Sequence, residues 1–155
     1  MGIVKPLRVY ADTSVFGGCF DDEFDSASEE FFREVRTGRF NLVISDAVVR
    51  ELQEAPERVR RLLAELPEEH VELVTIDEEV ASLRDAYLSA GVLGFAAAAD
   101  AEHIAAATVA EVDLVVSWNF KHIVHFDRIR GFNGVNTLNR YRPLEIHSPR
   151  EVVEL

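Results

Sequence analysis

Cysteine and long apolar runs are nearly absent from this sequence. Cys19 is the only cysteine among 155 residues, so neither an internal disulfide nor a cysteine-based zinc site can form. No apolar run approaches the ~20 residues that cross a bilayer. The opening residues, MGIVKPLRVYAD, lead into a strand-like segment instead of a signal peptide. We therefore expect a soluble, cytoplasmic chain with no membrane partner.

Positive charge is also scarce. Sixteen Lys and Arg residues against 28 Asp and Glu residues give a net charge of -12, which argues against a polyanionic partner. Residues 121–142, here called the basic segment, are the exception, with Asp127 as the only acid. Its cations are Lys121, Arg128, Arg130, Arg140 and Arg142. His122 and His125 add to this charge if they are protonated. A solvated loop is the ordinary explanation of such a run, and a phosphate-binding surface is the alternative.

Strand-like and helix-like segments alternate along the chain, and 48% of the residues are hydrophobic. We expect strands at residues 7–11, 41–44, 71–76 and 113–117. We expect helices from a capping box at Ser26 to Gly38, from 46 to 53, 56 to 66, 77 to 91, 100 to 111 and 121 to 124, with a loop at 91–99. This order predicts an α/β fold, a single domain over residues 1–155 whose parallel sheet is covered by helices on both faces.

Polar residues follow the ends of the predicted strands, where ligands bind in such sheets. Asp12 comes directly after the first strand and Asn119 just after the last. Glu51 lies on the helix after the second strand, and Asp100 and His103 lie one turn apart on a later helix. Each also has an ordinary structural explanation: a turn, a solvated face, an N-cap or a packed histidine. Together they place three carboxylates and an amide at one edge of the sheet.

Four motifs occur in order along the chain. Asp-Thr-Ser starts at Asp12, S-D-x-x-x-x-E-L at Ser45, D-A-x-H-I-A-x-A at Asp100, and L-V-x-S-W-N-F-K-H-I at Leu114. From about residue 8 to the tail, the sequence resembles the PIN-domain family, which includes toxins of the VapC type. The last motif is the most specific. The resemblance implies a parallel sheet between helices and a ribonuclease site that uses Mg²⁺ or Mn²⁺.

The resemblance also implies residue roles. Asp12, Glu51 and Asp100 match the family's acidic residues, which are expected to hold the metal and to be catalytic. Asn119 stands at a fourth catalytic position where many members have an aspartate. Ser14 matches a small polar residue that supports the site.

Further residues are expected around that site. His103 and Ser117 are expected to support the acids, and the basic segment is expected to bind RNA. The expected RNA contacts are Lys121, His122, Arg128 and Arg130. The resemblance further implies a homodimer and a possible small antitoxin, with this chain as the toxin of a type II pair.

Two other functions remain open at this stage. A phosphatase of the haloacid-dehalogenase type also begins with an Asp after the first strand, but its motif resembles D-x-D-x-T, whereas Ser14 occupies the second acid's place. A PIN-fold module that binds RNA or protein and has lost catalysis is the second alternative, because Asn119 brings no charge. Retention of Asp12, Glu51 and Asp100 argues against it.

Overall fold

A computed structural model describes residues 5–153 of the chain. Its centre is a five-stranded sheet with strand order β3-β2-β1-β4-β5, and every pairing is parallel. The strands are β1 (Leu7–Ala11), β2 (Phe40–Ser45), β3 (Val71–Val74), β4 (Leu114–Val116) and β5 (Ile146–His147). The predicted α/β fold with a parallel sheet is confirmed.

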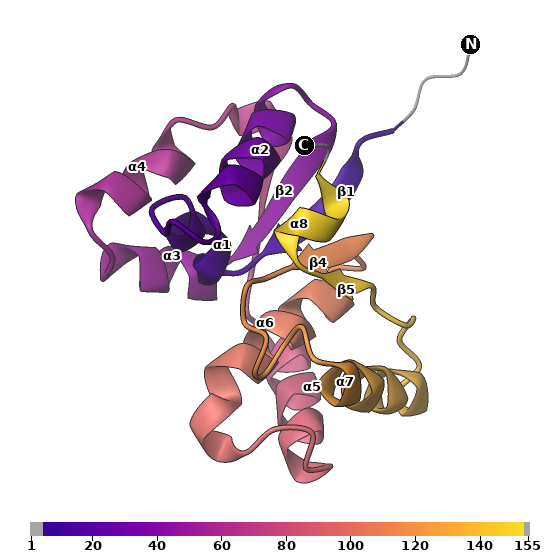
Figure 1. The fold of residues 1–155 in the computed structure, drawn as a ribbon. Coiled ribbons are helices and arrows are strands. Elements are labelled where there is room, and N and C mark those ends of the chain that lie inside the picture. The colour runs from indigo at the N-terminus through magenta and orange to yellow at the C-terminus, as the bar shows by residue number, and fades with distance from the viewer. Residues whose placement is uncertain (1–4, 154–155) are drawn as a thin grey trace.

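Helices cover both faces of this sheet (Figure 1). The α-helices are α1 (Thr13–Gly18), α2 (Asp25–Arg36), α3 (Asp46–Gln53), α4 (Glu57–Ala64), α5 (Glu78–Ser89), α6 (Ala98–Val109), α7 (Phe126–Leu138) and α8 (Pro149–Val152). Short 3-10 turns add η1 (Glu68–His70) and η2 (Phe95–Ala97). Helices α5, α6 and α7 pack together on one side, while α1 and α2 lie on the other. Helix α3 contacts both α1 and α6 at the edge between these layers.

The central strands supply the core because both of their faces are covered. Val9 and Tyr10 of β1 and Leu42 of β2 have no exposed surface. In the parallel register Tyr10 lies opposite Val43 of β2 and Val115 of β4. Burial of an aliphatic or aromatic side chain contributes about 1.5–3 kcal/mol, so this apolar centre fixes the sheet. The polar residues that follow these strands are thereby held at its carboxyl edge.

Two helix starts follow the prediction from side-chain caps. The Ser45 hydroxyl accepts a hydrogen bond from the Ala47 N–H at 3.2 Å and begins α3. The Asp77 carboxylate accepts one from the Val80 N–H at 3.0 Å and begins α5. Each cap satisfies a backbone donor that a helix start leaves unpaired.

The predicted capping box at Ser26 is wrong. Helix α2 begins at Asp25, and Phe24 occupies the N-cap position without a side-chain cap. The Asp21 carbonyl accepts the N–H groups of both Phe24 and Asp25, at 2.9 and 2.8 Å. A turn therefore leads straight into the helix, and the Ser26 hydroxyl has no capping role.

The prediction was also wrong around Asp100. Helix α6 begins at Ala98, because η2 runs directly into it, and Ala97 is the N-cap residue. Asp100 therefore lies in the first turn and does not cap the helix. Its carboxylate is left to contact other parts of the molecule.

The C-terminal third differs most from the prediction. Residues 121–124 form a turn, not a helix, because the Asn119 carbonyl accepts the N–H groups of Ile123 and Val124. Helix α7 then occupies much of the basic segment. The sequence patterns also missed α1, β5 and α8. Within the described part of the chain, no helix is long and apolar enough to cross a membrane.

Candidate active site

Asp12 lies at the carboxyl end of β1, the central strand of the sheet. Its side chain is 5% exposed. Its two carboxylate oxygens accept hydrogen bonds from the Ser14 hydroxyl at 2.5 Å and the Ser117 hydroxyl at 2.7 Å. These hydroxyls are themselves oriented, because Ser14 accepts the Trp118 N–H and Ser117 accepts the Asn119 N–H, both at 2.9 Å. The loop after β4 thus holds the carboxylate in one position.

Burial makes this carboxylate hard to ionise. Loss of solvent raises the pKa of Asp12 above its ordinary value of 3.8, and the negative charge of Asp100 adds to the effect. The charge of His103 and the bonds from the two serines oppose it without cancelling it. A positive charge placed beside Asp12 would favour the ionised form.

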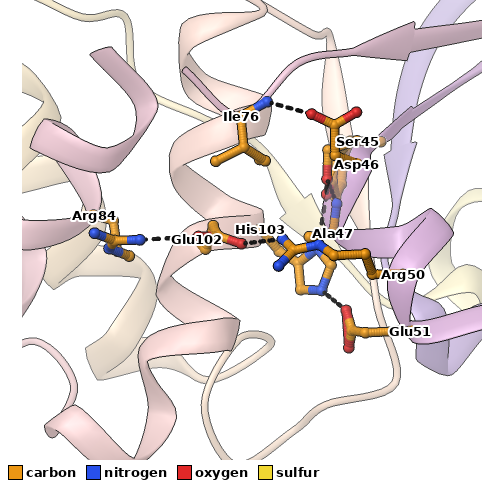
Figure 2. A network of polar contacts seen from close by, with 10 residues as sticks. Ser45, Asp46, Ala47, Arg50, Glu51, Ile76, Arg84, Glu102 and His103 are labelled. Carbon is orange, nitrogen blue, oxygen red and sulfur yellow. Dashed lines mark hydrogen bonds and ion pairs between the residues drawn. The ribbon is translucent and has the colours of Figure 1, made fainter. Parts of the chain in front are cut away.

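Glu51 ends a chain of buried polar groups. Its Oε1 lies 2.5 Å from Nε2 of His103, a residue that is 2% exposed (Figure 2). Nδ1 of His103 lies 2.7 Å from the Tyr10 hydroxyl, which lies 2.7 Å from the Ser45 hydroxyl. Ser45 also accepts the Ala47 N–H. The chain connects the core of the sheet to Glu51 and fixes the ring of His103.

The pKa values of this pair move in opposite directions. Burial alone would raise the pKa of Glu51, but the hydrogen bond and charge of His103 outweigh it, and the pKa is lowered. Burial alone would lower the pKa of His103, but the hydrogen bond to Glu51 and the charge of Asp12 raise it overall. Both shifts favour a carboxylate next to an imidazolium.

Asp100 and Asn119 meet through His122. Oδ2 of Asp100 lies 2.9 Å from Nδ1 of His122, and both side chains are partly exposed. Oδ1 of Asn119 accepts the His122 N–H at 2.9 Å. The Asn119 amide therefore closes the turn that brings His122 to Asp100.

The acids of this edge differ in how they are paired. Glu102 binds two arginines, Arg50 at 3.2 Å and Arg84 at 2.9 Å (Figure 2). Among residues 5–153, no lysine or arginine forms an ion pair with the other three acids of the site. These are Asp12, Glu51 and Asp100. Histidines take this role instead, because His103 contacts Glu51 and His122 contacts Asp100, while Asp12 has only hydroxyl donors.

The described residues contain no group of three or more His, Cys, Asp or Glu side chains that could hold a metal ion. Asp12, Glu51 and Asp100 lie at the same edge, but each is engaged by its own internal partner. Mg²⁺ commonly retains several waters and takes only one or two carboxylates directly from the protein. The carboxylate oxygens of Asp12 and Asp100 are therefore donors of the kind that a hard divalent cation takes, with water completing its shell.

The residues expected to bind RNA divide into two kinds. Lys121 and Arg130 are exposed, and the Arg130 guanidinium lies 5.6 Å from the centre of the Phe126 ring. Arg128 instead points inward and donates a hydrogen bond to the Val92 carbonyl at 2.6 Å. His122 is engaged by Asp100. Of these four side chains, Lys121 and Arg130 are thus the ones exposed on the surface.

Two clefts flank the acids. One of about 390 Å³ is lined by Ser14, Gly17, Gly18, Asp21, Phe24, Trp118 and Asn119. The other, of about 470 Å³, is lined by Ala47, Arg50, Glu51, Gln53, Glu54, Ala99 and Glu102. The sequence patterns did not indicate either cleft, and they missed Tyr10, which looks like an ordinary apolar strand residue. The sequence indicates Ser45 only as a helix cap.

Two solved structures share this architecture. A chain in the crystal structure of FitAcB from Neisseria gonorrhoeae matches with a TM-score of 0.57 and 15% identity over 93% of this chain and 99% of that chain. A chain in the crystal structure of VapBC2 from Rickettsia felis, bound to a DNA fragment from their promoter, matches with a TM-score of 0.55 and 12% identity. That match covers 92% of this chain and 98% of the other. No protein-family model and no curated protein matches the sequence.

Proposed function

Because the chain has the PIN-domain fold that its motifs predicted, we propose that it is a metal-dependent endoribonuclease that hydrolyses RNA phosphodiester bonds. One observation carries the proposal. Asp12, Glu51 and Asp100 share the carboxyl edge of the sheet, and no described lysine or arginine is paired with them. Histidines contact Glu51 and Asp100, but the Asp100 charge still raises the pKa of Asp12, and a bound divalent cation would offset the charge of both aspartates.

In this proposal Asp12 and Asp100 hold Mg²⁺ or Mn²⁺, and Glu51 contributes directly or through a bound water. The bound ion supplies an activated water and stabilises negative charge on the phosphoryl oxygens. Ser14 and Ser117 keep the Asp12 carboxylate oriented. His103 holds Glu51 in place, and Lys121 and Arg130 contact the phosphates of the RNA.

We also propose that the chain is the toxin of a toxin–antitoxin pair and forms a dimer. The support is architectural, because the similar chains come from FitAcB and from VapBC2 bound to promoter DNA. The implied partner is a small antitoxin. Co-expression with the product of the adjacent gene, followed by co-purification, tests this assembly.

Metal dependence is the first test of the proposed activity. Purified full-length protein is incubated with mixed RNA in Mn²⁺, in Mg²⁺ or in EDTA. We expect cleavage in the presence of either metal and none in EDTA. Equal cleavage in all three conditions would indicate a contaminating or metal-independent nuclease and would refute the proposal.

A PIN-fold binding module with weakened catalysis is the second candidate. Two observations favour it: the described acids form no group of three that could hold a metal, and Asn119 uses its amide oxygen to close a turn. This candidate predicts RNA or protein binding with no cleavage in Mn²⁺. The metal-dependence experiment therefore separates the two functions.

A further inference from the structure

We propose that the cleft of about 390 Å³ beside Asp12 is a binding site for one unpaired nucleobase of the RNA, next to the bond that is cut. The inference rests on the proposed function and names how its substrate is positioned. Ser14 links the two sites, because it lines the cleft and donates a hydrogen bond to Asp12 at 2.5 Å. A phosphate held at the acids would therefore place a neighbouring nucleoside at the mouth of the cleft.

Aromatic rings form one wall of this cleft. The Phe24 and Trp118 rings are stacked, with centroids 4.2 Å apart and planes inclined by 19°. Trp118 is buried, and its Nε1 donates a hydrogen bond to the Ser28 hydroxyl at 2.8 Å. The free ring surface thus belongs to Phe24, which is partly exposed, and to the adjacent Phe120, which is 47% exposed. A rigid ring of this kind stacks against a base.

The charge of the cleft favours a base over a phosphate. Among residues 5–153, Asp21 is the only ionisable residue that lines the cleft, so this lining is negative and disfavours a phosphate group. Asp21 accepts a hydrogen bond from the Glu23 N–H at 2.9 Å through one oxygen, which leaves the other as an acceptor for a base amino group. The side-chain oxygen of Asn119 accepts a hydrogen bond from the His122 N–H, so the amide hydrogens of Asn119 remain able to donate to a base. The phosphates of the RNA would instead contact Lys121 and Arg130.

Two glycines of α1, Gly17 and Gly18, line the cleft. A Cβ at Gly18 would lie 2.5 Å from the Ser28 hydroxyl and 2.7 Å from Trp118 Nε1, so packing requires glycine there. A Cβ at Gly17 would have no atom within 4 Å. Glycine within a helix is less stable than alanine by roughly 0.5–1 kcal/mol, and internal packing at Gly17 does not require it. A larger side chain at Gly17 would therefore occupy part of the cleft without a clash.

Gly17→Leu adds a bulky side chain at a residue that lines the cleft and takes no part in holding Asp12, Glu51 or Asp100, and it is the test variant. Gly94→Leu is its matched control, because Gly94 is an exposed glycine outside the basic segment where an added Cβ would likewise have no atom within 4 Å. Fluorescence anisotropy in EDTA measures the affinity of the full chain for two labelled RNA octamers. One is oligoadenylate, and the other has the same phosphates with abasic riboses. Thermal melting checks that both variants fold.

We expect wild type and Gly94→Leu to bind oligoadenylate roughly tenfold more tightly than the abasic octamer, as expected for one stacked base. In Gly17→Leu the two affinities should become nearly equal. An unchanged ratio in folded Gly17→Leu would overturn the base site, even if the protein cuts RNA in Mn²⁺. A ratio lost only in Gly17→Leu, without cleavage in Mn²⁺, would support the base site and refute the proposed nuclease. Absence of binding to either octamer would overturn the base site.

Discussion

Replacing Asp12 with asparagine should stabilise the metal-free protein at neutral pH. The wild-type carboxylate is 5% exposed and has two hydroxyl donors but no arginine or lysine ion pair within the described residues. Asparagine keeps the shape and removes the buried charge; its oxygen can accept from one serine hydroxyl, and its NH2 group can donate to the oxygen of the other. Removing a buried polar group whose interactions are incomplete should raise the free energy of unfolding by about 1–3 kcal/mol. For a chain of this size, this corresponds to roughly 2–12 °C in Tm.

The sign of the pH dependence follows from the pKa of Asp12. Burial raises this pKa in the folded protein above its ordinary value of 3.8. The folded state therefore holds the Asp12 proton to higher pH than the unfolded chain, and stability is lost as pH rises from about 3.8 through the raised pKa. The stability advantage of Asp12→Asn should thus be absent in acid and grow as pH rises through that interval.

Urea unfolding of both proteins in EDTA, between pH 4 and 8, measures this difference. Asp22→Asn is the control, because Asp22 is exposed and its replacement should change stability by less than about 0.5 kcal/mol. Saturating Mn²⁺ should reverse the order by stabilising wild type more than the variant. If Asp12→Asn is less stable than wild type in EDTA at pH 7, the Asp12 charge is compensated inside the fold and the reasoning fails.

Three further predictions concern the surroundings of the acids. Tyr10→Phe removes the hydroxyl that contacts His103 at 2.7 Å. It should lower the free energy of unfolding by about 1–3 kcal/mol, as measured by urea denaturation. An unchanged free energy of unfolding would show that this hydroxyl does not stabilise the fold. Asn119→Asp retains an oxygen that closes the turn and adds a negative charge. It should lower the Mn²⁺ concentration for half-maximal cleavage and destabilise the metal-free protein. If the Mn²⁺ dependence and the metal-free stability both stay unchanged, residue 119 does not face the carboxylates. Arg130→Ala should weaken RNA binding and reduce the slope of log affinity against log salt concentration by about one. Arg128→Ala should mainly lower Tm, because Arg128 binds the Val92 carbonyl. Equal slopes for wild type and Arg130→Ala would show that Arg130 is a solvated residue without a phosphate contact.

The fold was largely predictable because its central features are encoded locally. Apolar runs separated by caps identified four of the five strands, and Ser45 and Asp77 marked the starts of α3 and α5. Helix α7 was missed because it contains Gly131 and Gly134 and has little apolar periodicity. Gly131 fits because a side chain there would meet Val92 at 2.8 Å. Such a close approach between distant segments leaves no local signal.

The candidate site was predictable in its residue types but not in its contacts. Asp12 and Asp100 could be placed at the sheet edge from strand and helix order. The pairing of Tyr10 with His103 joins residues 93 positions apart, and nothing in the spacing of either residue indicates it. Likewise, the charge of Arg128 and its place in the basic segment predict an RNA contact, but in the fold its guanidinium donates a hydrogen bond to the Val92 carbonyl.

The rate of RNA cleavage by wild type and Asp12→Asn, at matched Mn²⁺ concentration, tests the central claim most directly. Asp22→Asn serves as the control, and an EDTA reaction gives the background. If the carboxylates hold the catalytic ion, Asp12→Asn should cleave roughly 10²-fold more slowly, while remaining folded and while Asp22→Asn matches wild type. Cleavage by Asp12→Asn at the wild-type rate would contradict the assignment of the active site to the carboxyl edge of β1.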